Sequence, residues 1–156
     1  MKIHIVAMGR IRSGPERALI DDYSGRFDRT GRPLSLGPLH EIEIDTRKAQ
    51  GAAAEADALR RAVPDGALIC ALDERGKNLT SPDLAQTISR WRDEGRPSAA
   101  FVIGGADGLH PEFRDGADQL LSLGRMVWPH MLARVMLTEQ LYRAASILSG
   151  SPYHRD

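Results

Sequence analysis

The chain has 156 residues, of which 42% are hydrophobic and 27% charged, and its formal net charge at pH 7 is zero. This composition predicts one globular domain, residues 1–156, and argues against a protein that coats nucleic acid non-specifically. No apolar run reaches the roughly 18 residues of a membrane span, and a strand pattern rather than a signal peptide follows Met1-Lys2. Cys70, the single cysteine, excludes a disulfide framework and a cysteine-based zinc site. We therefore expect a cytoplasmic protein.

The basic residues are unevenly distributed along the chain. Segments 1–36 and 119–156 are net basic, whereas 37–118 is net acidic. Most of the basic residues are arginines, which form forked hydrogen bonds to phosphate. Arg10, Arg12 and Arg17 lie in and just after one loop. If the fold brings the two basic ends together, they would form a phosphate-binding face.

Apolar runs and helical patterns alternate along the whole chain. The expected strands are 2–8, 40–44, 67–72, 99–103 and 120–123. The expected helices are 15–28, an alanine-rich helix capped by Asp45-Thr46 that ends near 62, 81–94 capped by Ser81, a short one from Pro111, and 130–149. This alternation predicts an α/β fold, with a mostly parallel sheet flanked by helices.

Three loops follow predicted strand ends, where ligands bind in open α/β sheets. They are the charged loop 72–77, the glycine-rich loop 104–110 and the loop 123–129. Gly104, Gly105 and Gly108 form GGxxG, which is neither a Rossmann dinucleotide fingerprint nor a phosphate-binding P-loop. The glycines indicate close approach of the backbone to a ligand, or only a tight turn.

The predicted helix 130–149 is apolar on more than one face. A helix on the surface of a monomer needs only a stripe about 100° wide, so this one is either central in the domain or shared with a partner subunit. After it come Tyr153, His154 and Arg155. These three residues are either a solvated tail or part of a site.

Two blocks resemble a known family. LSLGRMVWPHMLARVMLTEQLYRAASILSGSPYHR (121–155) and FVIGGADGLH (101–110) are similar to the signature blocks of the ribosomal RNA large-subunit methyltransferase H family. These bacterial enzymes belong to the SPOUT (α/β-knot) class. The resemblance spans essentially the whole chain and implies a trefoil knot near the C-terminus.

The resemblance implies S-adenosyl-L-methionine as the cofactor, held by the three loops. The family's contact positions fall on Leu72, Gly104, Gly105, Leu123, Gly124, Arg125, Met126, Val127 and Trp128. The last loop departs from the family pattern, because Gly124 replaces a common serine and Val127-Trp128 stands where threonine and a variable residue are usual. Backbone groups are expected to make most contacts there, so we expect cofactor binding to survive.

The implied reaction is methyl transfer to N3 of a pseudouridine in a loop of 23S rRNA, on the assembled 70S ribosome. By the same resemblance Arg143 is an active-site residue, and Tyr153, His154 and Arg155 belong to the tail that closes over the site. Arg143 would stabilise charge developing on the base, and His154 would accept or relay the N3 proton. We expect a homodimer whose tail and basic loop complete the partner's site. The expected RNA contacts are Arg10, Arg12, Arg125 and Arg155.

Two alternatives to this enzyme stay open at this point. A metabolic nucleotide-binding enzyme is compatible with GGxxG, but the acidic ribose ligand of a GxGxxG unit is absent. A non-catalytic ribosome-binding factor with the same fold would be consistent with the departures at Gly124 and Trp128. The five histidines show no metal-ligand spacing, so we expect no metal.

Overall fold

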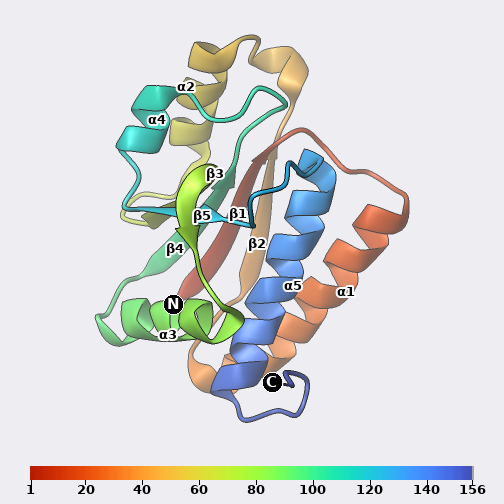
Figure 1. Cartoon of the computed structure of the whole chain (residues 1–156), viewed down its shortest axis with the longest axis vertical. Coiled ribbons are helices and arrows are strands. Elements are labelled where there is room, and N and C mark those ends of the chain that lie inside the picture. The colour runs from red at the N-terminus through yellow and green to blue at the C-terminus, as the bar shows by residue number, and fades with distance from the viewer. Residues whose placement is uncertain (156) are drawn as a thin grey trace.

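The computed structural model describes residues 1–155 and has a five-stranded sheet of order β2-β1-β4-β3-β5 (Figure 1). All four strand pairs are parallel. The strands are β1 (Lys2–Met8), β2 (Leu39–Ile44), β3 (Leu68–Asn78), β4 (Ser98–Ile103) and β5 (Gln119–Ser122). The helices are α1 (Pro15–Gly31), α2 (Ala52–Ala62), α3 (Ser81–Asp93), α4 (Pro111–Asp115) and α5 (His130–Leu148), with short 3-10 helices at Arg32–Leu34 and Thr46–Lys48. The predicted α/β class is confirmed, and the trefoil knot stays a prediction.

The sheet separates two apolar layers, and β1 serves both of them. Ile3, Ile5 and Ala7 belong to the core formed with α1, α3 and α5. Val6 and Met8 alternate with them and belong to the core formed with α2 and α4. This period of two is that of a strand buried on both faces. Within residues 1–155, no helix is long and apolar enough to cross a membrane.

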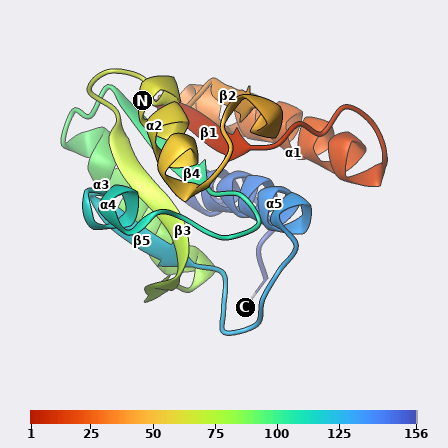
Figure 2. The same cartoon turned by 90° about the horizontal axis from the view of Figure 1, so that it is seen from above.

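Helix α5 is central in its layer, packed between α1 and α3. Leu137, Leu141 and Ala145 are wholly buried, which explains much of the apolar character of the helix. At its N-terminal end, however, Met131 and Leu132 stay 39% and 40% exposed. Because α1 and α5 lie side by side (Figure 2), the fold brings the two basic ends of the chain together.

The charged segment after Leu72 is a strand, so the expected loop 72–77 is wrong. Strand β3 continues to Asn78 and pairs a second time with β5, Lys77 with Leu121 and Asn78 with Ser122. In Figure 1 it bends across β5. A Cβ on Gly76 would lie 2.6 Å from backbone atoms of Leu121, so glycine allows this crossing. The charged residues predicted an exposed loop, but the pairing of this segment with β5, far along the chain, makes it a strand.

Two predicted helix caps are also wrong. Asp45 does not begin the alanine-rich helix; it caps the 3-10 helix Thr46–Lys48, accepting a hydrogen bond from the Arg47 amide at 3.0 Å. Helix α2 begins only after Gly51, whose φ of 89° ends the preceding turn. Helix α3 is capped by Thr80 rather than Ser81, through a capping box with Asp83.

Arg134 is the largest wholly buried side chain, and it joins α5 to the ends of β1 and β2. Its Nη1 donates to Glu41 at 2.9 Å and to Glu43 at 2.6 Å. Its Nη2 donates to the carbonyls of Met8 at 3.2 Å and Gly9 at 3.0 Å. The first turns of α5 are therefore fixed against the carboxyl edge of the sheet.

Replacing Arg134 with methionine is expected to lower the free energy of unfolding by about 2–3 kcal/mol. Within residues 1–155, Glu41 and Glu43 keep only Arg17 as a cationic partner, and the carbonyls of Met8 and Gly9 lose their donor. Urea unfolding measures the change. The matched control is Arg29→Met on the exposed side of α1, where we expect a change within about 0.5 kcal/mol. Equal losses in the two variants would contradict a special role for the buried arginine.

Candidate functional site

A cavity of about 400 Å³ opens at the carboxyl ends of β4 and β5, beside residues 72–75 in the middle of β3. Its apolar walls come from Leu72, Ile103, Leu109, Leu121 and Ala133, and its rim from the loops after β4 and β5. A cavity of this size, lined by apolar side chains and backbone, suits a small organic ligand. The cavity lies where parallel sheets bind ligands.

The glycine-rich loop after β4 folds back on itself, with the Gly108 amide donating to the Gly105 carbonyl at 3.0 Å. A Cβ on Gly104 would lie 2.9 Å from the Gly108 backbone, and one on Gly105 would lie 2.7 Å from the carboxylate of Glu55. The tight turn therefore requires Gly104, whereas a Cβ on Gly105 would meet only the end of the flexible Glu55 side chain from α2. The same glycines also line the cavity.

The loop after β5 covers another side of the cavity and is more exposed. Gly124 has φ of 113°, a conformation that disfavours the serine common at this position in the family. The hydroxyl of Ser122 donates to the Gly124 carbonyl at 3.0 Å and accepts from its amide at 3.2 Å. Trp128 Nε1 donates to the Leu123 carbonyl at 3.3 Å. The loop thus has a serine hydroxyl at position 122, two residues before Gly124. Trp128, which departs from the family pattern, closes the loop by its hydrogen bond to Leu123.

The structure gathers eight of the nine predicted cofactor residues around this one cavity: Leu72, Gly104, Gly105, Leu123, Gly124, Met126, Val127 and Trp128. The ninth, Arg125, is exposed outside the lining. The sequence prediction missed other lining residues, among them Asp73, Glu74, Asp107 and His130. Asp73, Glu74 and Asp107 lie inside the predicted loops and His130 directly follows one, so counting whole loops and the next residue as cavity lining would have found them.

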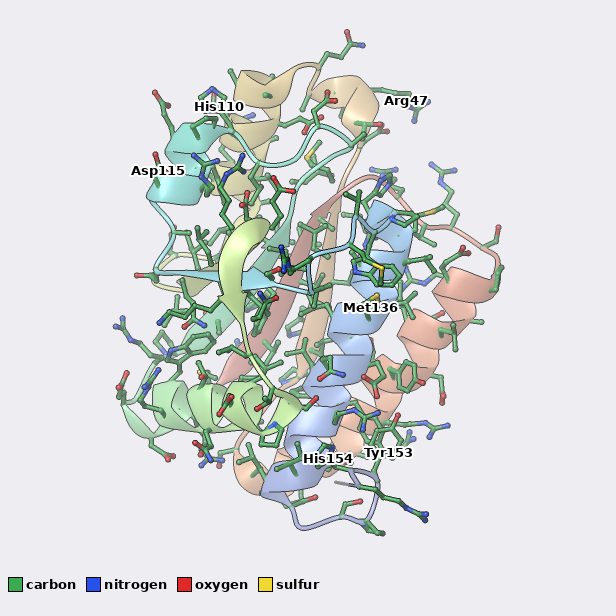
Figure 3. All side chains as sticks on the ribbon, viewed as in Figure 1. Arg47, His110, Asp115, Met136, Tyr153 and His154 are labelled. Atoms are coloured by element: carbon green, nitrogen blue, oxygen red, sulfur yellow. The ribbon has the colours of Figure 1, made fainter. Side chains whose placement is uncertain are left out.

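The predicted catalytic residues form a second cluster near the C-terminal end of α5 (Figure 3). One oxygen of Glu139, Oε1, accepts hydrogen bonds from Arg143 Nε at 3.0 Å and from the Tyr153 hydroxyl at 2.9 Å. Nη1 of Arg143 lies 3.4 Å from Nδ1 of His154. The Arg143 guanidinium also stacks over the Tyr153 ring, 4.8 Å from its centroid. Glu139 thereby positions the tail against the helix.

Burial and the neighbouring carboxylate set the charge states of this cluster. Burial, and then the hydrogen bond to Glu139, raise the pKa of Tyr153 well above its usual range. The hydrogen bond to Glu139 also raises the pKa of Arg143. Tyr153 is therefore a neutral hydroxyl and Arg143 a fixed cation at physiological pH. Tyr153 can donate a hydrogen bond but is a poor candidate for a base.

The two clusters lie at opposite ends of the same helix. His130 lines the cavity and Arg143 lies thirteen positions later on α5, which corresponds to roughly 20 Å along a helix axis. Figure 3 shows Tyr153 and His154 beside the end of α5 farthest from its first turn. Within one chain, Arg143 and the tail therefore do not reach a ligand in the cavity.

The predicted RNA-binding arginines are all exposed and fall in three places. Arg10 and Arg12 lie on the loop after β1, Arg125 on the loop after β5, and Arg155 on the tail. The described part of the chain holds no group of three or more histidines, cysteines and carboxylates that could bind a metal ion. His4 and His40 stack with ring centroids 5.4 Å apart, and His110 caps α4.

The chain is similar to proteins whose names state an activity. The family model described as "Predicted SPOUT methyltransferase" matches residues 1–154. The protein named Ribosomal RNA large subunit methyltransferase H is 63% identical in Dinoroseobacter shibae and 61% identical in Ruegeria sp. (strain TM1040), over 155 residues and 99% of both chains. The protein of that name in Roseobacter denitrificans is 62% identical over 156 residues and all of both chains.

A solved structure supports the fold alone. It is described as a probable methylase family protein from Haemophilus influenzae Rd KW20, and it matches with a TM-score of 0.55 at 15% sequence identity. The match covers 99% of this chain and 70% of that one.

Substituting Glu139 with alanine is expected to lower the pKa of Tyr153 toward its ordinary value, because the carboxylate that disfavours the phenolate is removed. The pKa stays above that value, since burial is the larger cause. Titration of the tyrosine Cζ resonances by NMR measures it. Glu139→Gln keeps an acceptor oxygen without the charge, so it should cause a smaller change. An unaltered Tyr153 titration in Glu139→Ala would show that the carboxylate does not hold the tail.

Proposed function

Because the chain belongs to the SPOUT methyltransferase family, we propose that it methylates N3 of a pseudouridine in a loop of 23S rRNA, using S-adenosyl-L-methionine. The chain is an α/β methyltransferase. The proposed substrate rests on the 61–63% identity, over essentially full length, to relatives named ribosomal RNA large subunit methyltransferase H.

The cavity at the sheet edge fits the proposed cofactor in size and chemistry. Its apolar walls suit the faces of a purine, and its rim of loop backbone offers donors and acceptors to the purine edge. Asp73, Glu74 and Asp107 line the cavity together with Arg75, which pairs with Asp73 at 3.4 Å and Glu74 at 3.6 Å. The charged part of the lining therefore stays net acidic, which suits a cationic ligand. S-adenosyl-L-methionine supplies an electrophilic methyl group on a sulfonium when bound.

The cluster on α5 supplies groups for the target base. N3 of pseudouridine carries a weakly acidic proton that leaves as the N–CH₃ bond forms. Arg143, a fixed cation held by Glu139, would stabilise the negative charge that develops on the base. Tyr153 would donate a hydrogen bond, and His154 beside Arg143 would accept or relay the proton. Alignment of donor and acceptor supplies much of the remaining rate enhancement.

A homodimer would bring the two clusters together. The tail of one chain would have to reach the cavity of its partner, because the two lie roughly 20 Å apart along one helix. Three exposed apolar side chains line the cavity, Met126, Val127 and Trp128, and two more, Met131 and Leu132, follow them on the first turn of α5. Figure 2 shows the loop between β5 and α5 projecting beyond the sheet and helices. Exposed apolar side chains gathered in this way mark an interaction surface.

The proposed substrate is the assembled 70S ribosome in the cytoplasm. All of residues 1–155 are accounted for by the sheet, its helices and the tail, so the chain has no separate RNA-binding domain among them. A loop base is accessible without opening a duplex. Arg10, Arg12, Arg125 and Arg155 are the proposed phosphate contacts.

Wild-type protein is expected to transfer radiolabelled methyl from S-adenosyl-L-methionine to the large-subunit rRNA of 70S ribosomes whose pseudouridine is unmethylated. Isolated subunits should accept much less label. Arg143→Ala should lower kcat by about 10²–10³, the cost of losing one group that stabilises developing charge.

The control for that experiment is Arg90→Ala, an exposed arginine on α3 that should leave kcat unchanged. Absence of label from the wild type, with cofactor binding demonstrated by calorimetry, would contradict the proposed reaction. It would favour a ribosome-binding factor that kept the fold and lost turnover.

Two inactive variants are expected to restore activity when they share one dimer. Arg143→Ala removes the proposed catalytic arginine, and Leu123→Glu places a carboxylate in the cofactor cavity. A heterodimer then has one intact composite site, which joins the cavity of the first chain to the tail of the second. The measurement is methyl transfer by heterodimers that are co-expressed with two different tags.

Each homodimer, purified and assayed in the same way, is the control. If each chain contained a complete site, the heterodimer would be as inactive as its parents. Calorimetry should show that Leu123→Glu has lost cofactor binding while Arg143→Ala has kept it.

A further inference from the structure

A second cavity, of about 350 Å³, lies at the carboxyl ends of β1 and β2. It is lined by Arg10 and Arg12 from the loop after β1 and by Asp45, Thr46 and Arg47 from the turn after β2. The two segments are neighbours because β1 and β2 pair in register up to Met8 and Ile44. We call these five residues the arginine cleft. Figure 3 places Arg47 at this edge of the molecule.

The arginine cleft has a net positive charge, with three guanidinium groups against one carboxylate. Asp45 is 9% exposed and accepts hydrogen bonds from Arg47 Nε at 3.1 Å and Nη2 at 2.8 Å. These contacts to Arg47 hold the pKa of Asp45 far below its usual range. The Arg47 side chain is nevertheless 78% exposed. Its guanidinium is therefore fixed in orientation while it stays accessible to a ligand.

The loop that carries Arg10 and Arg12 is also held in place. Arg134 donates to the Gly9 carbonyl at 3.0 Å, and the Ile11 amide donates to Glu43 at 2.8 Å. The backbone is thus fixed on both sides of Arg10, so less ordering is needed when a ligand binds. Two preorganised segments, both bearing guanidinium groups, face one cavity.

We propose that the arginine cleft binds a phosphodiester of the rRNA strand next to the target nucleotide. This rests on the proposed function and adds the turn after β2, with Thr46 and Arg47, to its RNA-binding surface. Guanidinium groups bind phosphate oxygens with two parallel hydrogen bonds, and a threonine hydroxyl supplies another donor. Such contacts fix the position of a strand without reading its sequence.

The position of the cleft suits a strand that passes the cofactor cavity. Both cavities open at the carboxyl edge of the sheet, one at β2 and β1, the other at β4 and β5 beside the middle of β3. They are separated by about two strand spacings, roughly 10 Å. A nucleotide whose phosphate lies in the arginine cleft is therefore close to a base presented at the cofactor cavity.

The test compares Arg12→Gln and Arg12→Gln/Arg47→Gln with Arg90→Gln, which is exposed on α3 away from the carboxyl edge. The double variant should raise the KM for 70S ribosomes about tenfold, the size expected for loss of a charge-assisted hydrogen bond. Its kcat and its affinity for S-adenosyl-L-methionine should stay at wild-type values. The slope of log Kd against log salt for ribosome binding should fall by about one.

If the wild type labels ribosomes but KM and salt slope are equal in all variants, the proposed role of the arginine cleft is wrong and the proposed function stands. If the wild type labels no ribosomes, the proposed function is wrong. The salt slope of ribosome binding then still tests whether the arginine cleft binds phosphate. The single variant Arg12→Gln leaves the contact between Arg47 and Asp45 unchanged, so it tests the cleft without disturbing Asp45. It should raise the KM in the same direction by a smaller factor.

Discussion

The buried guanidinium of Arg134 is the interaction on which both cavities depend. It reaches from α5 to two carboxylates of β2 and two carbonyls at the end of β1. Burying a charge costs more than a close-packed apolar contact of the same volume would, so stability alone does not explain an arginine here. The geometry explains the arginine, because the loop after β1 and the start of α5 meet at this one side chain. We infer that the role of Arg134 is to position these two segments.

The same helix sets the distance between the two halves of the proposed active site. The first turn of α5 borders the cofactor cavity, and its later turns carry Glu139 and Arg143. A helix packed between α1 and α3 cannot bend to close a gap of roughly 20 Å. The separation is therefore a fixed property of the fold. In the proposed homodimer a second chain would bring the two clusters together, and it would also cover exposed apolar residues such as Met126 and Val127 at the cavity.

Local pattern predicts most of this fold, and the failures lie where distant segments meet. Apolar runs and Ser/Thr/Pro signals located every strand and long helix, although β3 was ended six residues too early and α2 was begun several residues too early. The charged half of β3 was missed because its partner, β5, lies more than forty residues later. The Arg134 network was missed for the same reason, since Glu41 precedes it by 93 positions. The loops after β4 and β5 were found because parallel strands place their carboxyl ends together. The arginine cleft was missed because it depends on the short 3-10 helix Thr46–Lys48, which the sequence pattern assigned to a longer helix.

A two-fold dimer has a further consequence for the composite site. In an isologous interface each contact occurs twice, so the cavity of either chain meets the tail of the other. Both sites then form together or not at all. Tyr153 of the tail and Arg143 of α5 both donate to one oxygen of Glu139. In the proposed dimer this carboxylate would order groups that act at the partner's cavity, although it belongs to neither cavity lining of its own chain. In such a dimer, Glu139 would be needed for a site that lies on the partner chain.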